Sequence, residues 1–186
     1  MSQPANLLPE TVLRNYFHAK DENRPMILDA TFAPDATLEV KNQTTAISFP
    51  AQTVGRPGVA DVLVRNFCQT YDNIYSFYLS RPSAPLRRFT CGWLVAMTEK
   101  STSAVRVGSG SYDWTFSDTP PNLATRLVIT IANMQVLPAA SMPAVFAWVT
   151  KLTYPWSSLG EVRARSPELP AVQAVLASLA EGEHAT

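Results

Sequence analysis

The sequence predicts an α+β fold in which amino-terminal helices pack on a strongly curved antiparallel sheet, forming a cone with an internal pocket. Apolar residues recur at helical spacing up to about residue 71 and then alternate with period two as far as residue 137. Two glycines interrupt the middle of the second region. Because the helices precede the strands instead of alternating with them, the class is α+β and not α/β.

The first region predicts three helices and two short extended segments. Val12, Leu13, Tyr16 and Phe17 form the apolar stripe of the first helix, and prolines stand where helices begin or end. The helices are expected over residues 9–21, 25–33 and 59–71. The extended segments are expected over residues 36–40 and 47–49.

The second region predicts a meander of strands over residues 74–80, 88–99, 103–116 and 125–137. Gly108 and Gly110 lie inside one of these strands, where they suit the bend or bulge that curls a sheet around a cavity. Two apolar helices are expected to follow, over residues 140–152 and 168–180. We therefore expect an α+β domain at residues 8–137 and a carboxy-terminal helical extension, residues 138–186, packed on the same domain.

Composition narrows the range of partners. Hydrophobic residues make up 46% of the chain and charged residues 16%, well below the usual quarter, which indicates a large apolar interior, a ligand cavity or a buried oligomer face. Lysine plus arginine equal aspartate plus glutamate at 15 each, so no basic surface favours nucleic acid. The low charge and the surplus of aromatic residues predict a homodimer.

The sequence predicts neither a targeting segment nor a membrane span, and it predicts no metal site. The first residues lack a basic region followed by a long apolar run, and no segment approaches the roughly 18 apolar residues of a membrane span, so we expect a cytoplasmic protein without membrane contact. Cys68 and Cys91 are expected to be buried free thiols, and the only histidines are His18 and His184. We therefore expect no metal and no cofactor.

Four short segments resemble the SnoaL-like proteins of the nuclear transport factor two (NTF2) and ketosteroid isomerase superfamily. They are NYFHA at residues 15–19, FAPDATLE at 32–39, VGRPGV at 54–59 and GSYD at 110–113. The resemblance covers about residues 8–137. It implies the cone-shaped helix-and-sheet fold and relatives that often form homodimers.

The same resemblance implies roles for two positions. Tyr16 lies where ketosteroid isomerases carry the tyrosine that donates a hydrogen bond to a developing oxyanion. In this resemblance Val40 stands at the position of their aspartate base, and a valine side chain cannot act as an acid or a base. Glu39 is one residue away, but strand geometry turns it to the opposite face.

The pattern of the strands predicts the site residues. The predicted catalytic residues are Asp113, because a carboxylate in an apolar pocket has a raised pKa suited to proton transfer, and Tyr16, because the family resemblance implies an oxyanion donor there. The predicted ligand-binding residues are Trp93, Asn133, Tyr112 and Phe89. Strand alternation places Phe89, Trp93, Asp113 and Asn133 on the inner face. The alternate face would place Tyr112 and Trp114 inward, and a bulge near the glycines would exchange the faces partway along.

Two functions remain open from the sequence. The first is a small-molecule-binding domain with an apolar pocket, whose enzymatic form is a lyase, isomerase or cyclase acting by general acid–base catalysis. The second is a non-catalytic homodimeric interaction module. A weaker third is an epoxide hydrolase like limonene epoxide hydrolase, which needs an arginine between two acids. Arg106 and Arg126 are the candidate arginines.

Overall fold

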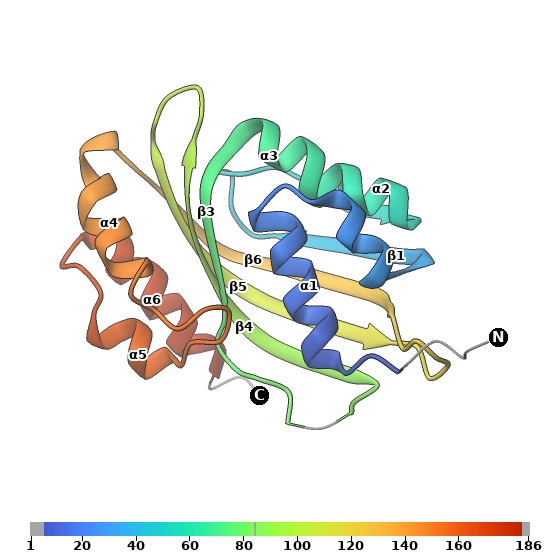
Figure 1. The fold of residues 1–186 in the computed structure, drawn as a ribbon. Coiled ribbons are helices and arrows are strands. Elements are labelled where there is room, and N and C mark those ends of the chain that lie inside the picture. Colours follow the sequence, from blue (N-terminus) through green and yellow to red (C-terminus); the bar gives the residue numbers. More distant parts are fainter. Residues whose placement is uncertain (1–5, 84, 184–186) are drawn as a thin grey trace.

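The computed structural model describes residues 6–83 and 85–183. A six-stranded sheet of order β2-β1-β6-β5-β4-β3 separates two groups of helices (Figure 1). The predicted α+β class with amino-terminal helices on a sheet is confirmed. The strands are β1 (Phe32–Asn42), β2 (Gln52–Val54), β3 (Tyr71–Tyr78), β4 (Arg88–Glu99), β5 (Val105–Phe116) and β6 (Ala124–Leu137).

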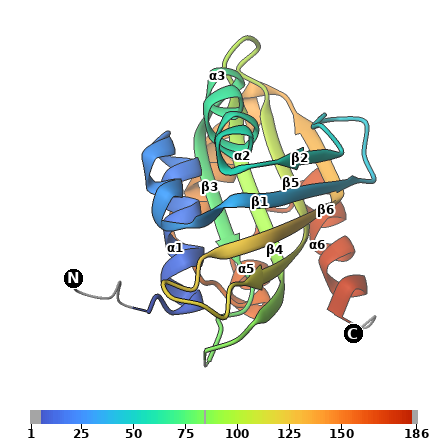
Figure 2. The same cartoon turned by 90° about the vertical axis from the view of Figure 1, so that its right-hand side faces the viewer.

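The sheet is mostly antiparallel, with one parallel pair that the sequence-based prediction lacked. Strand β1 runs parallel to β6, while the other neighbours are antiparallel. The helical segment of residues 56–70 causes this arrangement, because it carries the chain from β2 at one edge to β3 at the other. The meander then returns across the sheet and ends beside β1. The sheet twists and its long strands bend (Figure 2), which agrees in part with the strong curvature expected.

The amino-terminal helices cover the inner face of the sheet. Helix α1 (Pro9–Asp21) buries the predicted apolar stripe, and a 3-10 helix, η1 (Pro25–Ala30), follows it. Helix α2 (Arg56–Ala60), a π-helical turn, η2 (Asp61–Arg65), and α3 (Asn66–Thr70) continue without a break.

Two expected boundaries in this region are wrong. The second helix ends before residue 33, because β1 begins at Phe32 and Pro34 cannot continue a helix. Residues 47–49 lie in a loop, and the short strand follows at residues 52–54. Local hydrogen bonds fold this loop, since the Asn42 amide donates to the Ile47 carbonyl and its side-chain oxygen accepts from the Thr44 N–H.

The carboxy-terminal helices cover part of the outer face. They are η3 (Ala139–Ser141), α4 (Met142–Val149), α5 (Leu159–Ala164) and α6 (Pro170–Glu183). Val105 and Val107 of β5 form a second core with Val145, Trp148 and further side chains of these helices. Helix α5 was not expected; Ser158 caps it by accepting a hydrogen bond from the Glu161 N–H. The domain boundary at residue 138 stays a prediction.

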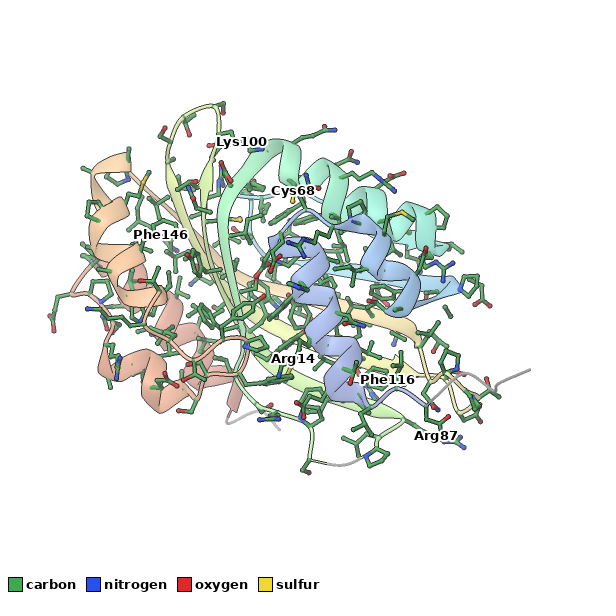
Figure 3. All side chains as sticks on the ribbon, viewed as in Figure 1. Arg14, Cys68, Arg87, Lys100, Phe116 and Phe146 are labelled. Carbon is green, nitrogen blue, oxygen red and sulfur yellow. The ribbon has the colours of Figure 1, made fainter. Side chains whose placement is uncertain are left out.

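Side chains fill the space on both sides of the sheet (Figure 3). On the inner side, Phe17 stacks on Tyr78 with ring centroids 3.8 Å apart. On the outer side, the Trp148 indole is buried and donates to the Val162 carbonyl. Many of the aromatic residues that predicted a homodimer are therefore buried within one chain.

Within the described residues, no helix is both long and apolar enough to span a membrane. A cytoplasmic location stays a prediction. His184 lies outside the described residues.

Candidate functional site

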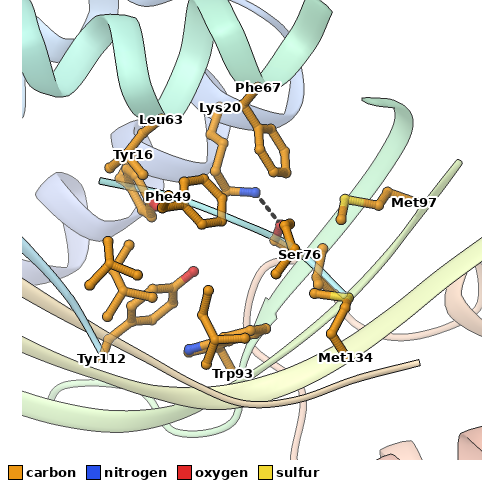
Figure 4. Close-up of a pocket in the computed structure, with 15 residues that line it drawn as sticks. Tyr16, Lys20, Phe49, Leu63, Phe67, Ser76, Trp93, Met97, Tyr112 and Met134 are labelled. Atoms are coloured by element: carbon orange, nitrogen blue, oxygen red, sulfur yellow. Dashed lines mark hydrogen bonds between the residues drawn. The ribbon is translucent and has the colours of Figure 1, made fainter. Parts of the chain in front are cut away.

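A pocket lies between α1, the α2–α3 segment and the inner face of the sheet (Figure 4). The space in which the centre of a water molecule can move is about 50 Å³. Aliphatic, aromatic and methionine side chains make most of the wall. The polar lining residues are Tyr16, Lys20, Ser76, Trp93 and Tyr112.

The two glycines of β5 clear the space for the pocket floor. Gly110 lies opposite Trp93 in the β4–β5 register, and Gly108 lies opposite Val95. A Cβ on Gly110 would come within 2.8 Å of Trp93 Cζ2, and one on Gly108 within 2.4 Å of the Met134 methyl. The glycines thus admit large side chains over the strand, whereas the sequence indicated a bend or bulge at their own position.

The bulge lies nearby, on the neighbouring strand. Ser109 pairs with Asn133, but Gly110 pairs with Ile131, so β6 contains an extra residue at Ala132. An extra residue exchanges the two faces of a strand. Ile131 and Met134 therefore both line the pocket.

Three aromatic residues form one wall. The Tyr16 and Tyr112 rings meet edge to face at 5.9 Å, and Trp93 stacks on Tyr112 at 5.7 Å. Burial raises the pKa of Tyr16 and of Tyr112 above the ordinary value of a phenol. Both hydroxyls therefore stay protonated at neutral pH, so they can donate hydrogen bonds but cannot act as bases.

A buried polar cluster of Lys20, Asp21 and Ser76 lies at the opposite side of the pocket, and its Lys20 and Ser76 line the wall. The Lys20 ammonium donates to Asp21 Oδ1 at 2.7 Å and to Ser76 Oγ at 2.6 Å. The Asp21 carboxylate also accepts from the Ser76 hydroxyl at 2.8 Å and from the Ser76 N–H at 3.0 Å. The side chains of Lys20 and Asp21 are only 7% and 5% exposed, so this is an ion pair inside the protein.

Sequence reasoning missed this cluster, although a signal was present. Lys20 follows Tyr16 by four residues and Phe17 by three, so it belongs to the apolar stripe of α1. A charged residue inside such a stripe indicates a buried cation with a partner. The partner strand, β3, is distant in sequence and could not be identified from that signal alone.

The Trp93 side chain, 5% exposed, carries an unpaired donor. Its indole Nε1 has no hydrogen-bond partner among the described residues. Figure 4 shows the ring on the pocket floor with its nitrogen on the side of Tyr112. Buried indole N–H groups usually find an acceptor.

The structure places Asp113 away from the pocket, contrary to the sequence-based expectation. It lies on the outer face, where Arg88 donates to its carboxylate at 2.8 and 2.5 Å. This ion pair lowers the pKa of Asp113, which is the opposite of the raised pKa expected for a general acid. The reason is that both faces of β5 are apolar: Tyr112 and Trp114 pack inward, while Val105 and Val107 pack under the carboxy-terminal helices.

Two of the four predicted ligand-binding residues line the pocket, and two do not. Trp93 and Tyr112 line the pocket, and so does Tyr16. Asn133 instead faces α6, where its amide donates to the Ala174 carbonyl at 3.4 Å, because the bulge turns it outward. Phe89 packs against the inner core opposite Trp114 but does not line the pocket.

The positions singled out by family resemblance are placed as expected. Val40 lines the pocket, while Glu39 faces the other side of the sheet and pairs with Arg126 at 2.8 Å. The place of a carboxylate base is therefore apolar. Arg106 pairs with Glu99 at 3.2 Å, and neither arginine has two carboxylates among its ion-pair partners in the described part of the chain.

A metal site is not formed by the residues that the structure describes, since they contain no group of three or more His, Cys, Asp or Glu side chains arranged to hold an ion. The expected lack of metal and cofactor stays a prediction.

Comparisons with known proteins identify the fold of this chain. No family model matches the sequence. No curated protein matches it either. Solved structures do match. One is a hexachlorocyclohexane dehydrochlorinase, which is 10% identical to this chain with a TM-score of 0.54. The match covers 68% of this chain and 84% of the dehydrochlorinase chain. An NTF2-like superfamily protein from Salmonella enterica is 10% identical with a TM-score of 0.52, covering 64% and 85%.

A third match comes from Catenulispora acidiphila, a hypothetical protein of ketosteroid isomerase-like fold in complex with trimethylamine. It is 16% identical, with a TM-score of 0.51, and covers 66% of this chain and 85% of its own. Helices and sheet are arranged in this chain as in those proteins. The chain therefore has the NTF2-like fold, the fold also described as ketosteroid isomerase-like.

Proposed function

We propose that the chain binds a compact, mainly apolar small molecule in the pocket between α1 and the inner sheet face. The observation that carries this proposal is the composition of the wall, which is apolar except for a few polar groups that converge on one space. Such a wall is typical of small-molecule sites. The volume of about 50 Å³ favours a ligand of a few heavy atoms over a polycyclic one.

The polar groups of the pocket are hydrogen-bond donors. Tyr16 and Tyr112 stay protonated, Lys20 is an ammonium paired with Asp21, and the Ser76 hydroxyl donates to Asp21. The described residues that line the pocket include no Asp, Glu or His. This set supports binding and charge stabilisation more strongly than proton abstraction.

A lyase, isomerase or cyclase activity is the enzymatic form of the proposal. Buried donors stabilise negative charge that develops on an oxygen during such reactions, and Tyr16 and Lys20 are the groups placed for this role. The sequence segments similar to SnoaL-like proteins, and solved structures of a dehydrochlorinase and a ketosteroid isomerase-like protein with this fold, support the same reaction classes. Asp113 has no part in it.

A pocket-filling variant tests the proposal. Cyclopentanone is titrated into the protein while methyl NMR signals of Ile129, Ile131 and Met134 are recorded. We expect these signals to shift in the wild type but not in Val95→Phe, where the added ring occupies the cavity. Val136→Phe is the matched control, because Val136 is 50% exposed and does not line the pocket. Loss of binding in both variants, or shifts confined to other regions, would overturn the proposal.

We also propose that the chain forms a homodimer. The proposal rests on its low content of charged residues. The buried aromatic side chains no longer argue for it. Sedimentation equilibrium at tens of micromolar, a range in which specific interfaces associate, should give twice the chain mass of 20.4 kDa. A mass of one chain would contradict the dimer and leave the pocket proposal unaffected.

A further inference from the structure

We infer that Met134 determines the size of ligand that the pocket accepts, because its thioether fills the space above Gly108 and limits the pocket to compact molecules. The inference rests on the proposed function, since it names the residue that sets the specificity of the same pocket. Two independent features of the sheet carry it. A bulge in β6 turns Met134 inward, and a glycine in β5 makes room for the end of its side chain.

The bulge in β6 places a thioether where regular alternation would place an amide. Ile129 and Ile131 line the pocket, and alternate residues of a strand share a face, so Asn133 would be the next lining residue. The extra residue at Ala132 shifts this pattern by one position, and Met134 lines the pocket instead. Asn133 faces α6. The pocket therefore has an apolar, flexible side chain at this point of its wall.

Gly108 makes room for the end of that side chain. The two residues are register partners on β5 and β6. A Cβ on Gly108 would lie 2.4 Å from Met134 Cε and 2.8 Å from its Sδ, so the thioether occupies the space that a side chain at position 108 would need. Figure 4 shows the Met134 side chain extending from the sheet toward Ser76 and Met97. The thioether thus takes up volume beside the cavity that a larger ligand would require.

Substitutions at the two positions should change the pocket in opposite directions. In Gly108→Ala the added Cβ displaces the flexible end of Met134 into the pocket and narrows it. Met134→Ala removes the thioether and widens the pocket. A cavity of about 50 Å³ is sensitive to the gain or loss of a few wall atoms.

Two ketones test the inference, cyclopentanone and 2-propylcyclopentanone, whose propyl group has as many heavy atoms as Met134→Ala removes. Both are titrated into the wild type and the variants, and the methyl NMR signals of Ile129 and Ile131 report binding. We expect the wild type to prefer cyclopentanone and Met134→Ala to reverse this preference, with a gain of about tenfold for the larger ketone. Met142→Ala is the matched control, because it deletes the same atoms on the outer side of the sheet and should keep the wild-type preference.

Gly108→Ala provides a second, independent measurement. It should weaken cyclopentanone binding by about tenfold in the wild type, but much less in the Met134→Ala background, where the added Cβ meets no thioether. The Asn133 carbonyl oxygen, 3.0 Å from that Cβ, is present in both backgrounds, so its effect cancels in the comparison.

An unchanged preference in Met134→Ala, or equal effects of Gly108→Ala in the two backgrounds, would overturn the inference and leave the proposed function standing. Absence of cyclopentanone binding to the wild type would overturn both. If Met134→Ala does not fold, Met134→Val removes fewer atoms and is measured in the same way. It should shift the preference toward the larger ketone, and an unshifted preference would overturn the inference.

Discussion

The indole ring of Trp93 lies over the Cα atom of Gly110, its register partner on the neighbouring strand. A Cβ added to Gly110 would lie 2.8 Å from Trp93 Cζ2 and 1.8 Å from the Thr130 carbonyl oxygen. The backbone oxygen cannot move away easily, because it belongs to the centre of the sheet. The position of the pocket floor thus depends on the absence of a side chain at residue 110.

We therefore predict that Gly110→Ala destabilises the protein by about 3 kcal/mol, as expected for overpacking against rigid backbone. Urea unfolding measures this change. Gly92→Ala is the control, because a Cβ there meets the flexible end of Leu79 at 3.2 Å and should cost under about 1 kcal/mol. Equal losses in the two variants would show that Gly110 has no special role in the packing of Trp93.

Removal of the Lys20 charge should destabilise the fold through Asp21. In Lys20→Met the Asp21 carboxylate stays buried without its cation, a situation that costs roughly 3–5 kcal/mol. The double variant Lys20→Met/Asp21→Asn should recover part of the loss, because the amide oxygen can still accept from the Ser76 N–H. Denaturant unfolding of both variants provides the measurement. A double variant less stable than the single one would contradict a buried ion pair.

Asp113→Asn should leave cyclopentanone binding unchanged, because Asp113 lies on the outer face of the sheet. Arg88 lowers the pKa of Asp113 below its ordinary value of 3.8. A lowered pKa in the folded state stabilises the fold above the unfolded-state pKa, and this contribution is lost as the pH falls through the folded-state pKa. The wild type should thus be slightly more stable than the variant at neutral pH and equal to it in strong acid. Thermal unfolding across that pH range is the measurement, and a large loss of binding would contradict this placement of Asp113.

The loop of residues 43–51 should control access to the pocket. Its residues Ile47 and Phe49 line the pocket, and the Arg106 guanidinium donates to the Ala46 carbonyl of the same loop. In Arg106→Leu we expect faster amide hydrogen exchange across residues 43–51, with the strands unchanged. Arg126→Leu removes an ion pair on the other sheet face and serves as the control. Unchanged exchange in Arg106→Leu would show that other contacts hold the loop.

Much of the fold follows from local patterns in the sequence. The stripe of Val12, Leu13, Tyr16 and Phe17 identifies α1, and period-two alternation identifies β4 to β6 closely. The parallel pairing of β1 with β6 could not be predicted, because it depends on where a later helix takes the chain. Pairing between distant segments leaves no local signal.

The candidate site was predicted only in part, for a related reason. Tyr16 was identified from the family resemblance and Trp93 from strand alternation, whereas Tyr112 was expected to face inward only on the alternate strand face. Asp113 and Asn133 were misplaced because the carboxy-terminal helices make both faces of β5 apolar and a single extra residue in β6 exchanges its faces. The Lys20 cluster joins α1 to β3 across 56 residues of sequence, so the charge within the apolar stripe indicates a buried partner but does not identify Ser76.

A crystal structure of the protein with cyclopentanone is the most direct test of the pocket as a ligand site. We expect the ring to lie between Tyr112, Ile131 and Met134. A separate groove of about 360 Å³ is an alternative binding site for cyclopentanone. It is lined by Leu7, Leu86, Phe116 and neighbouring residues. Ligand found only in that groove, with none between α1 and the sheet, would contradict the account.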